Sequence, residues 1–248
     1  MSKVLSIIIP VYNEEGAIES VLRQWHEELD KLDIDYQICA YNDGSKDQTM
    51  TILNKLKPEL PNLVVVDKAN SGHGPTILKG YIDNLDSEWI FQVDSDDEMQ
   101  PTWFKEIWAH NKRYDFIIGS RYGRTQALPR FVLSVISRLT IRTFFGGRIH
   151  DVNSPFRLMR VKSFKDCFLT IPSHTFAPNI IITGYAAYNK LQAAELDVPQ
   201  RDRQTGEVSL KKWKLFKAGV LSLLQTIIYR LKFMPSVKSN KHIKGSNL

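Results

Sequence analysis

Two aspartates separated by one residue, Asp94 and Asp96, form a pair with clear chemical potential. They follow the apolar run 89–93, which has the composition of a strand, and residues i and i+2 of an extended chain face the same way. Two carboxylates that project together are hard oxygen ligands suited to Mg²⁺ or Mn²⁺, with phosphates completing the coordination shell. Such a metal would neutralise charge on a departing nucleoside diphosphate. The alternative is a solvated acidic turn, because Asp97 and Glu98 follow directly.

Two further polar clusters follow other apolar runs. Asn42 and Asp43 end the run 36–42, where their side chains could bond a base edge or a ribose. The loop 70–74 contains Gly72 and could bring backbone N–H groups close to an anion at a helix N-terminus. A turn with a helix cap is the alternative for both clusters, and the loop 70–74 lacks the spacing of a P-loop or a dinucleotide fingerprint.

Arginines and two basic segments extend the set of candidates. Arg121, Arg201 and Arg203 are candidate phosphate contacts, because a guanidinium group can donate two parallel hydrogen bonds to a phosphate. The segments 129–145 and 211–233 have the spacing of basic amphipathic helices, which is compatible with lying on a membrane surface. Packing against the sheet with a solvated basic face is the alternative for both segments.

Alternating strands and helices would position these side chains. Such alternation predicts an α/β fold with a mainly parallel sheet flanked by helices, in which ligands bind at the carboxyl ends of the strands. The polar clusters lie at those ends. The predicted strands cover 5–11, 36–42, 63–67, 88–94, 115–119, 156–160 and 191–198, and the predicted helices cover 15–32, 46–57, 74–85, a segment after Pro101, 129–145 and 211–233.

Length and composition fit one α/β domain. The chain has 248 residues, of which 43% are hydrophobic and 24% charged, as in ordinary globular proteins. Its net charge of +6 is below the charge density of a nucleic-acid binder, so no nucleic-acid partner is expected. Cys39 and Cys167 fit no metal or redox spacing and are typical of reduced thiols in a cytosolic protein. No signal peptide or transmembrane segment is expected.

Four motifs occur in order along the chain: 9–14 (Ile-Pro-Val-Tyr-Asn-Glu), 42–49 (Asn-Asp-Gly-Ser-Lys-Asp-Gln-Thr), 70–74 (Asn-Ser-Gly-His-Gly) and 94–96 (Asp-Ser-Asp). Together they resemble the motifs of family 2 glycosyltransferases of the GT-A fold. The match is specific over about the first 125 residues, and the segments 119–122, 151–160 and 203–210 are similar to the dolichyl- and polyprenyl-phosphate sugar synthase branch. The resemblance implies a Rossmann-like nucleotide-diphospho-sugar transferase domain over 1–233, which ends in the basic helix 211–233, and a flexible tail over 234–248.

The resemblance also implies a nucleotide site. Pro10, Tyr12 and Glu14 would frame the base and ribose of the donor, and Asp43 would contact the nucleoside. Relatives often carry two acids at the end of the second strand, and Asn42 replaces the first of them here, which bears on the choice of nucleotide.

Other residues would contact the metal and the phosphates. By the same resemblance, Asp94 and Asp96 would bind Mg²⁺ or Mn²⁺ and the diphosphate. Glu98 falls where this branch often has a glutamine near the metal. Arg121 and Arg203 would bind the acceptor phosphate or the donor diphosphate.

The implied reaction is inverting transfer from a UDP- or GDP-sugar to a polyprenyl phosphate or a cell-envelope glycan. A hydroxyl acceptor needs a general base, whereas a phosphate acceptor is already anionic. Relatives often carry an acid within 175–179, where this chain has Asn179. Its absence fits a phosphate acceptor, or else His174 or Asp151 serves as the base. We expect a cytoplasmic protein with peripheral contact at the inner face of a membrane.

Two other functions are compatible with a fold of this kind. A nucleotidyltransferase that makes sugar nucleotides usually has a glycine-rich loop with a basic residue after the first strand, and this chain has Tyr-Asn-Glu-Glu at 12–15. A non-catalytic nucleotide-sugar-binding module would keep the fold without the chemistry, and the presence of both Asp94 and Asp96 argues against it.

Overall fold

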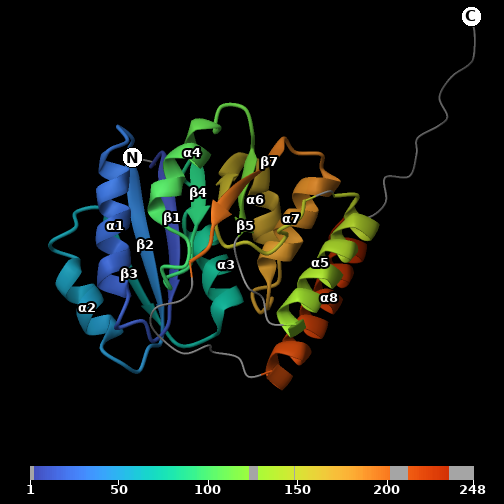
Figure 1. The fold of residues 1–248 in the computed structure, drawn as a ribbon, viewed down its shortest axis with the longest axis horizontal. Helices are drawn as coiled ribbons and strands as arrows, with labels where there is room; N and C mark the ends of the chain where they lie inside the picture. Colours follow the sequence, from blue (N-terminus) through green and yellow to red (C-terminus); the bar gives the residue numbers. More distant parts are fainter. Residues whose placement is uncertain (1–2, 123–127, 148, 202–211, 235–248) are drawn as a thin grey trace, which may run out of the picture.

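The computed structural model describes residues 3–122, 128–147, 149–201 and 212–234 (Figure 1). These residues form a seven-stranded sheet with the order β3-β2-β1-β4-β6-β5-β7. β6 is antiparallel to both of its neighbours, and the other pairings are parallel. The strands are β1 (Leu5–Val11), β2 (Tyr36–Asp43), β3 (Leu63–Lys68), β4 (Trp89–Gln92), β5 (Phe116–Tyr122), β6 (Arg157–Arg160) and β7 (Ala193–Pro199).

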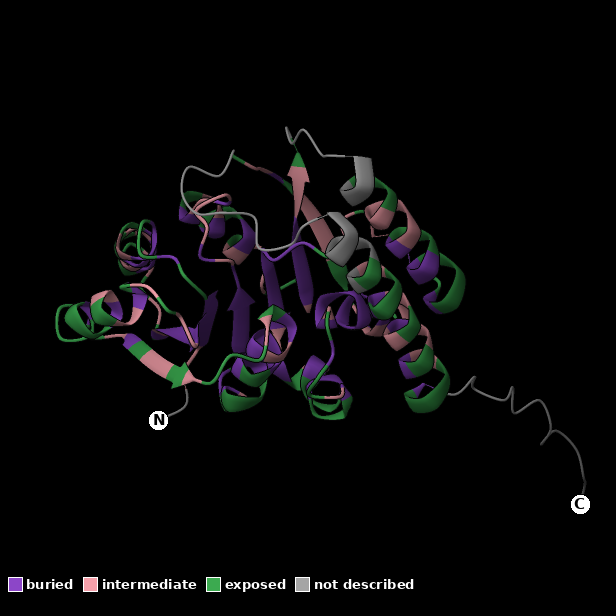
Figure 2. Cartoon of the chain, turned by 90° about the horizontal axis from the view of Figure 1, so that it is seen from below, coloured by how far each residue is buried: buried purple, intermediate pink, exposed green. Residues whose placement is uncertain are grey.

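Helices cover both faces of this sheet, and the central strands are buried between them (Figure 2). One hydrophobic cluster includes side chains of α1, α2 and α4, and the other includes side chains of α3, α6 and α7. The expectation of an α/β fold with a mainly parallel sheet is confirmed. The helices are α1 (Ile18–Asp30), α2 (Thr49–Leu56), α3 (His73–Asp83), the short 3₁₀ helix η1 (Pro101–Trp103), α4 (Phe104–Ala109), α5 (Leu128–Phe145), α6 (Val161–Thr170), α7 (Pro178–Tyr188) and α8 (Lys212–Phe233).

The order of the strands places the candidate site. β1 lies between β2 and β4. The chain therefore runs outward from β1 through β2 to β3, and then crosses back to add β4 on the other side of β1. In open α/β sheets the crevice at such a reversal, outside the carboxyl ends of the strands, is where ligands bind. The loops that follow β1, β2, β3 and β4 carry the polar motifs of the sequence.

Three features differ from the expectations. α6 and α7 were not predicted, and α7 is buried on most of its surface, so no helical alternation marks it in the sequence. β4 ends at Gln92, two residues before Asp94, because the chain turns there. Met234, assigned above to the tail, is buried, and the rest of that tail lies outside the described residues.

α5 and α8 lie side by side at one end of the molecule (Figure 1). Both helices also pack on α7. Within the described part of the chain, no helix is long and apolar enough to cross a membrane.

Candidate functional site

Asp94 and Asp96 line one hollow at the carboxyl edge of the sheet, as expected. They lie in the loop that follows β4, where Asp97 adopts a left-handed backbone with φ of 58°. The hollow has a volume of about 260 Å³, including space open to solvent. Its wall is acidic on the side of this loop and basic where Arg121 enters from β5. The lining residues are Val93, Asp94, Asp96, Glu98, Met99, Arg121, Pro155 and Gln200.

Asp94 is held by two neighbours. His73 Nε2, at the start of α3, lies 3.0 Å from Asp94 Oδ1, and Gln92 Nε2 donates to the same oxygen at 3.4 Å. Burial alone would raise the pKa of Asp94, but the charge and the hydrogen bond of His73 lower it. Asp94 is therefore a carboxylate at neutral pH. The sequence singled out the loop before α3 as an anion contact and missed His73 as the partner of Asp94.

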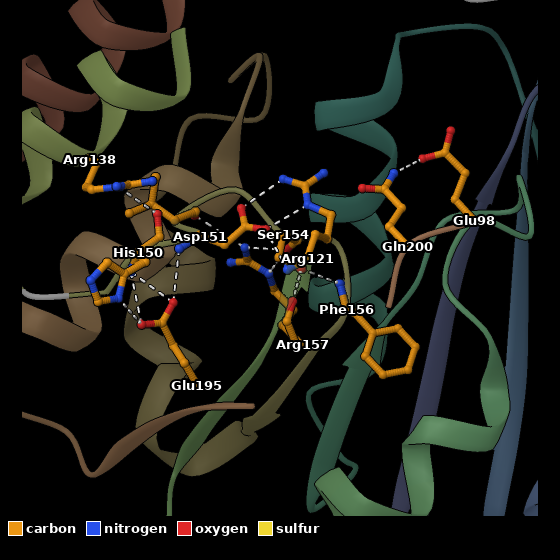
Figure 3. A network of polar contacts seen from close by, with 12 residues as sticks. Glu98, Arg121, Arg138, His150, Asp151, Ser154, Phe156, Arg157, Glu195 and Gln200 are labelled. Atoms are coloured by element: carbon orange, nitrogen blue, oxygen red, sulfur yellow. Dashed lines mark hydrogen bonds and ion pairs between the residues drawn. The ribbon is translucent and has the colours of Figure 1, made fainter. Parts of the chain in front are cut away.

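Arg121 and Asp151 form a two-bond ion pair at the same hollow (Figure 3). Arg121 Nε donates to Asp151 Oδ2 at 2.7 Å, and Nη2 donates to Oδ1 at 2.8 Å. Desolvation opposes ionisation, but the hydrogen bonds and the opposite charges lower the pKa of Asp151 and raise that of Arg121. Among the described residues, Arg121 Nη1 has no hydrogen-bond partner, so it can bind an anion in the hollow.

Glu98 lines the hollow but is bonded to another segment. Gln200 Nε2, just after β7, donates to the Glu98 carboxylate (Figure 3). The Arg201 N–H donates to the Glu98 carbonyl at 2.9 Å. Over the described ranges, no three His, Cys, Asp or Glu side chains are grouped so that they could hold a metal ion together. Asp94 and Asp96 are hard oxygen donors that fit Mg²⁺ or Mn²⁺, provided that phosphate or water supplies the remaining ligands. A metal contact by Glu98 stays a prediction.

The acidic end of β2 binds the loop before α3. Asp43 is buried, and its carboxylate accepts the N–H groups of Ser71 and Gly72, each at 2.8 Å, and the Lys68 ammonium. Burial alone would raise the pKa of Asp43, but these hydrogen bonds lower it. The N–H of Gly72 is therefore already bonded within the protein. Contacts from Asp43 and Gly72 to a nucleotide stay predictions.

Asn42 also faces the protein. Its Nδ2 donates to Asp67 Oδ1 at 2.7 Å, and its Oδ1 accepts the Ser45 hydroxyl at 2.5 Å. Asn42 is buried, and these two bonds hold the turn after β2 against β3.

The loop after β1 contacts the loop after β2. The N–H of Glu14 donates to Thr49 Oγ1 at 2.9 Å, and Asn13 Oδ1 accepts the N–H of Lys46 at 2.8 Å. Pro10 is buried in β1, Glu14 is buried, and Tyr12 is exposed. Of the residues predicted to frame the nucleotide, Tyr12 is thus the one whose side chain is most available to a ligand. The roles of all three stay predictions.

Two of the remaining candidates, His174 and Asn179, do not line the hollow. His174 is exposed, does not line the hollow, and forms no hydrogen bond with any described residue. Asn179 is buried, and its Nδ2 donates to Gln92 Oε1 at 2.8 Å, so it is not placed to accept a proton from a substrate. Arg203 lies outside the described residues.

Comparisons with known proteins agree on family and fold. The sequence profile of glycosyl transferase family 2 matches residues 6–168. An undecaprenyl-phosphate 4-deoxy-4-formamido-L-arabinose transferase from Shewanella sediminis is 27% identical over 210 residues, which cover 82% of this chain and 60% of the relative. The chain thus spans about 60% of the length of such curated relatives.

Two solved structures are similar at low sequence identity. Glucosyl-3-phosphoglycerate synthase from Mycobacterium tuberculosis, in complex with Mn²⁺, UDP and phosphoglyceric acid, has a TM-score of 0.66 and 15% identity, covering 93% of this chain and 79% of its own. Residues 1–349 of S. aureus TarS, in complex with UDP, have a TM-score of 0.55 and 23% identity, covering 91% and 65%. The profile match extends over more than half of the chain, and the chain therefore belongs to glycosyl transferase family 2, with the GT-A fold.

Proposed function

We propose that this chain is a metal-dependent, inverting glycosyltransferase that moves a sugar from a UDP- or GDP-sugar to a lipid-linked phosphate acceptor. The observation that carries the proposal is the hollow in which Asp94 and Asp96 face Arg121. One wall suits a divalent cation and the opposite wall suits an anion. The names of the curated relatives, which are undecaprenyl-phosphate sugar transferases, support this class of acceptor.

The donor would bind at the carboxyl ends of β1, β2 and β4. Asp94 and Asp96 would hold Mg²⁺ or Mn²⁺, and Tyr12 and the end of β2 would lie on the nucleoside side. A bound divalent ion supplies positive charge that stabilises the departing nucleoside diphosphate. Complexes of the similar structures with UDP and Mn²⁺ support this reading, and Mn²⁺ and UDP are the first ligands to test.

The acceptor phosphate would bind at Arg121. Its oxygen would form a bond with the anomeric carbon as the bond from that carbon to the donor diphosphate oxygen breaks, which inverts the configuration. A phosphate oxygen is already anionic, so this step needs no general base. The burial of Asn179 and the distance of His174 from the hollow support an acceptor of this kind. Asp151 would act mainly by orienting Arg121, because both of its oxygens accept hydrogen bonds from that side chain.

α5 and α8 give the chain a surface suited to an anionic bilayer. α8 buries Ser222 and Thr226 together with Tyr229, and several of its large aliphatic side chains are exposed on its outer face. Ile228 is 58% exposed and Leu231 is 69% exposed. α5 likewise exposes large apolar side chains, although it buries Ile141 and Phe145 as well as Ser137 and Thr140. The exposed apolar residues of the pair are Phe131, Val132, Leu139, Phe144, Val220, Leu221, Leu224, Ile228, Leu231 and Phe233.

The charges of this helix pair favour the same partner. The sequence contains three arginines in α5 and five lysines and arginines in α8, and neither helix contains an acid. Apolar side chains interspersed with cations are typical of helices that lie in the headgroup region of an anionic membrane. We therefore propose peripheral contact with the cytoplasmic leaflet, where a lipid-linked acceptor would be found.

The proposal is tested by incubating the full chain with UDP- and GDP-sugars, Mn²⁺ and a short-chain polyprenyl phosphate. Mass spectrometry would detect a glycosylated lipid phosphate, and NMR of its anomeric proton would show the inverted configuration. Formation of a sugar nucleotide from a sugar phosphate would instead support the nucleotidyltransferase alternative, which the family assignment disfavours. Nucleotide binding without any transfer, to a lipid phosphate or to a cell-envelope glycan, would indicate a binding module.

A further inference from the structure

Arg157, the first residue of β6, is a cation buried without an acidic partner. Its side chain is 0% exposed. Nε and Nη2 donate to the carbonyl of Ser154, at 2.8 and 2.5 Å, and Nη1 donates to the carbonyl of Asn179 at 3.0 Å. A longer bond of 3.4 Å reaches the carbonyl of Val152. Over the described residues, none of its hydrogen-bond partners is a carboxylate.

Such a group is costly to bury. Moving a charge out of water costs several kcal/mol unless hydrogen bonds and opposite charges offset it. Desolvation lowers the pKa of Arg157 to about 10, which still leaves it charged at neutral pH. An apolar residue would fill this part of the core without that cost. The arrangement therefore favours a role in fixing the geometry of the carbonyls that surround it.

These carbonyls belong to the segment that carries Asp151. Val152 and Ser154 lie in the loop 151–155, between Asp151 and β6, and Arg157 draws both carbonyls to one guanidinium group (Figure 3). On the other side of Asp151, the Glu195 carboxylate accepts its N–H at 3.0 Å. Asp151 in turn holds Arg121 at the hollow. These hydrogen bonds, together with the short backbone of the loop and the bond from the Ser154 N–H to the Asp151 carbonyl at 3.2 Å, connect the buried cation to the anion-binding side of the site.

Arg157 also lies next to the acidic side of the site. In the sheet it is the register partner of Gln92, which donates to Asp94. Asn179, whose carbonyl Arg157 binds, donates from its amide to Gln92 Oε1. This second connection ends in the 3.4 Å hydrogen bond from Gln92 to Asp94, which is longer than the 2.7 and 2.8 Å bonds between Arg121 and Asp151 that end the first.

We propose that Arg157 is a positioning residue, which fixes the loop 151–155 and thereby holds the Asp151–Arg121 pair in the geometry that the hollow requires. It does not line the hollow. Its effect on the reaction would be indirect, through Arg121. The part of the test that uses turnover rests on the proposed transferase function, and the part that uses hydrogen exchange does not.

Arg160 provides a matched control on the same strand. It pairs with Trp89 at the amino end of β4, at the opposite end of β6 from Arg157. Its guanidinium group binds Asp115 and the carbonyl of Asn111, and lies 4.1 Å from the centre of the Trp89 ring. Arg160→Lys therefore removes a fork of hydrogen bonds of similar size from β6 without touching the loop 151–155.

The experiment compares Arg157→Lys with Arg160→Lys by amide hydrogen exchange of the full chain. Lysine keeps the charge but cannot bond several carbonyls in the planar geometry of a guanidinium group. We expect exchange across 150–156 to be at least about tenfold faster in Arg157→Lys and unchanged in Arg160→Lys. Thr183→Val is a milder second variant, because Thr183 Oγ1 donates to the carbonyl of Val152 at 2.9 Å, and it should accelerate exchange in the same segment. Equal exchange in all variants would overturn the proposal.

Turnover separates positioning from a purely structural role. A displacement of about 1 Å can lower turnover by about 100-fold, so we expect Arg157→Lys to lower it by about 10- to 100-fold per folded molecule. In an Arg121→Lys background the same change should have an effect of less than about twofold, because residues that act through one another are not additive. Fully additive losses would contradict action through Arg121. If the unaltered chain transfers no sugar, the proposed function fails, and hydrogen exchange alone decides the role of Arg157.

Discussion

Arg121 and Asp151 are 30 residues apart in the chain, yet their side chains meet through two nearly parallel hydrogen bonds of 2.7 and 2.8 Å. Both side chains are mostly buried. The pair joins β5 to the loop before β6 and leaves one nitrogen of the guanidinium group without a partner in the described structure. Its geometry therefore serves both stability and anion binding.

Removing Arg121 should leave a largely buried carboxylate without its partner. We expect Arg121→Gln to lower the free energy of unfolding by about 2 kcal/mol or more, because the desolvation of Asp151 is no longer offset. Asp151→Asn should recover part of this loss when combined with Arg121→Gln. Urea denaturation of the two single variants and the double variant measures the coupling, and additive losses would show that the ion pair contributes nothing of its own.

The same pair predicts a dependence of stability on pH. The folded-state pKa of Asp151 is lowered. Asp151 therefore contributes stability that is present above its unfolded pKa and is lost as pH falls through the folded pKa. The unfolded pKa of an aspartate is about 3.9. The difference in unfolding free energy between the unaltered chain and Asp151→Asn should be constant from about pH 7 to pH 5 and shrink below about pH 4. A difference that grows on acidification would contradict the assignment.

Gly74, at the start of α3, should not tolerate a side chain. A Cβ atom there would lie 2.2 Å from the carbonyl oxygen of Phe176 and 2.3 Å from that of Thr175, and both are backbone atoms that cannot easily move. We expect Gly74→Ala to destabilise the fold by about 1–3 kcal/mol. Gly146→Ala is the control, because a Cβ atom there would meet no other atom within 4 Å. The cost at Gly146 would come from its positive φ of 77° alone. A smaller loss of stability in Gly74→Ala than in Gly146→Ala, measured by thermal or urea denaturation, would contradict the steric argument.

Membrane contact should depend on the outer face of α8. We expect Ile228→Glu and Leu224→Glu to weaken binding to phosphatidylglycerol-containing vesicles by about tenfold or more, because each removes apolar area and adds an unfavourable charge. Val64→Glu changes an exposed aliphatic residue on β3, which lies on the opposite side of the molecule from α8 (Figure 1), and should have little effect. Binding should also weaken as salt is raised.

Two results of the vesicle experiment would contradict membrane contact. One is an equal loss of binding in all three variants, which would show a general effect of charge. The other is sedimentation of the unaltered chain as a dimer that Ile228→Glu dissociates, with no vesicle binding at all. That result would assign the exposed face of α8 to a second copy of the chain.

The sequence was most informative where burial is complete. β1 is buried along its whole length, so its run is apolar except for the small residue Ser6, and its bounds agree with the prediction. α7 was missed for a related reason: Ile180, Ile181 and Ile182 are all buried, and a helix that is buried on most of its surface lacks the alternation that marks an amphipathic one. Pro178 at its first turn was the remaining local signal.

The motifs of the site were more predictable than their contacts. The pairing of Asp94 with Asp96 in one hollow was expected from their spacing, although they project from a turn after β4 and not from the strand itself. The contacts of Asp94 with His73 and of Glu98 with Gln200 join segments that are far apart in the chain. Arg157 could not be identified from sequence, because a lone arginine in a strand does not reveal that it is buried.

The proposed function depends most directly on metal-dependent binding of a nucleotide at Asp94 and Asp96. Calorimetric titration of the full chain with UDP and with GDP, each with and without Mn²⁺, measures it. We predict that one nucleotide binds only with Mn²⁺, and that Asp96→Asn weakens this binding at least tenfold, because hydrogen bonds and ligand bonds to a charged group contribute about 1.5–3 kcal/mol. Asp97→Asn is the control: the left-handed backbone there accommodates asparagine, and Asp97 does not line the hollow. Binding that is unchanged in Asp96→Asn, or no binding of either nucleotide to the folded chain, would contradict the account.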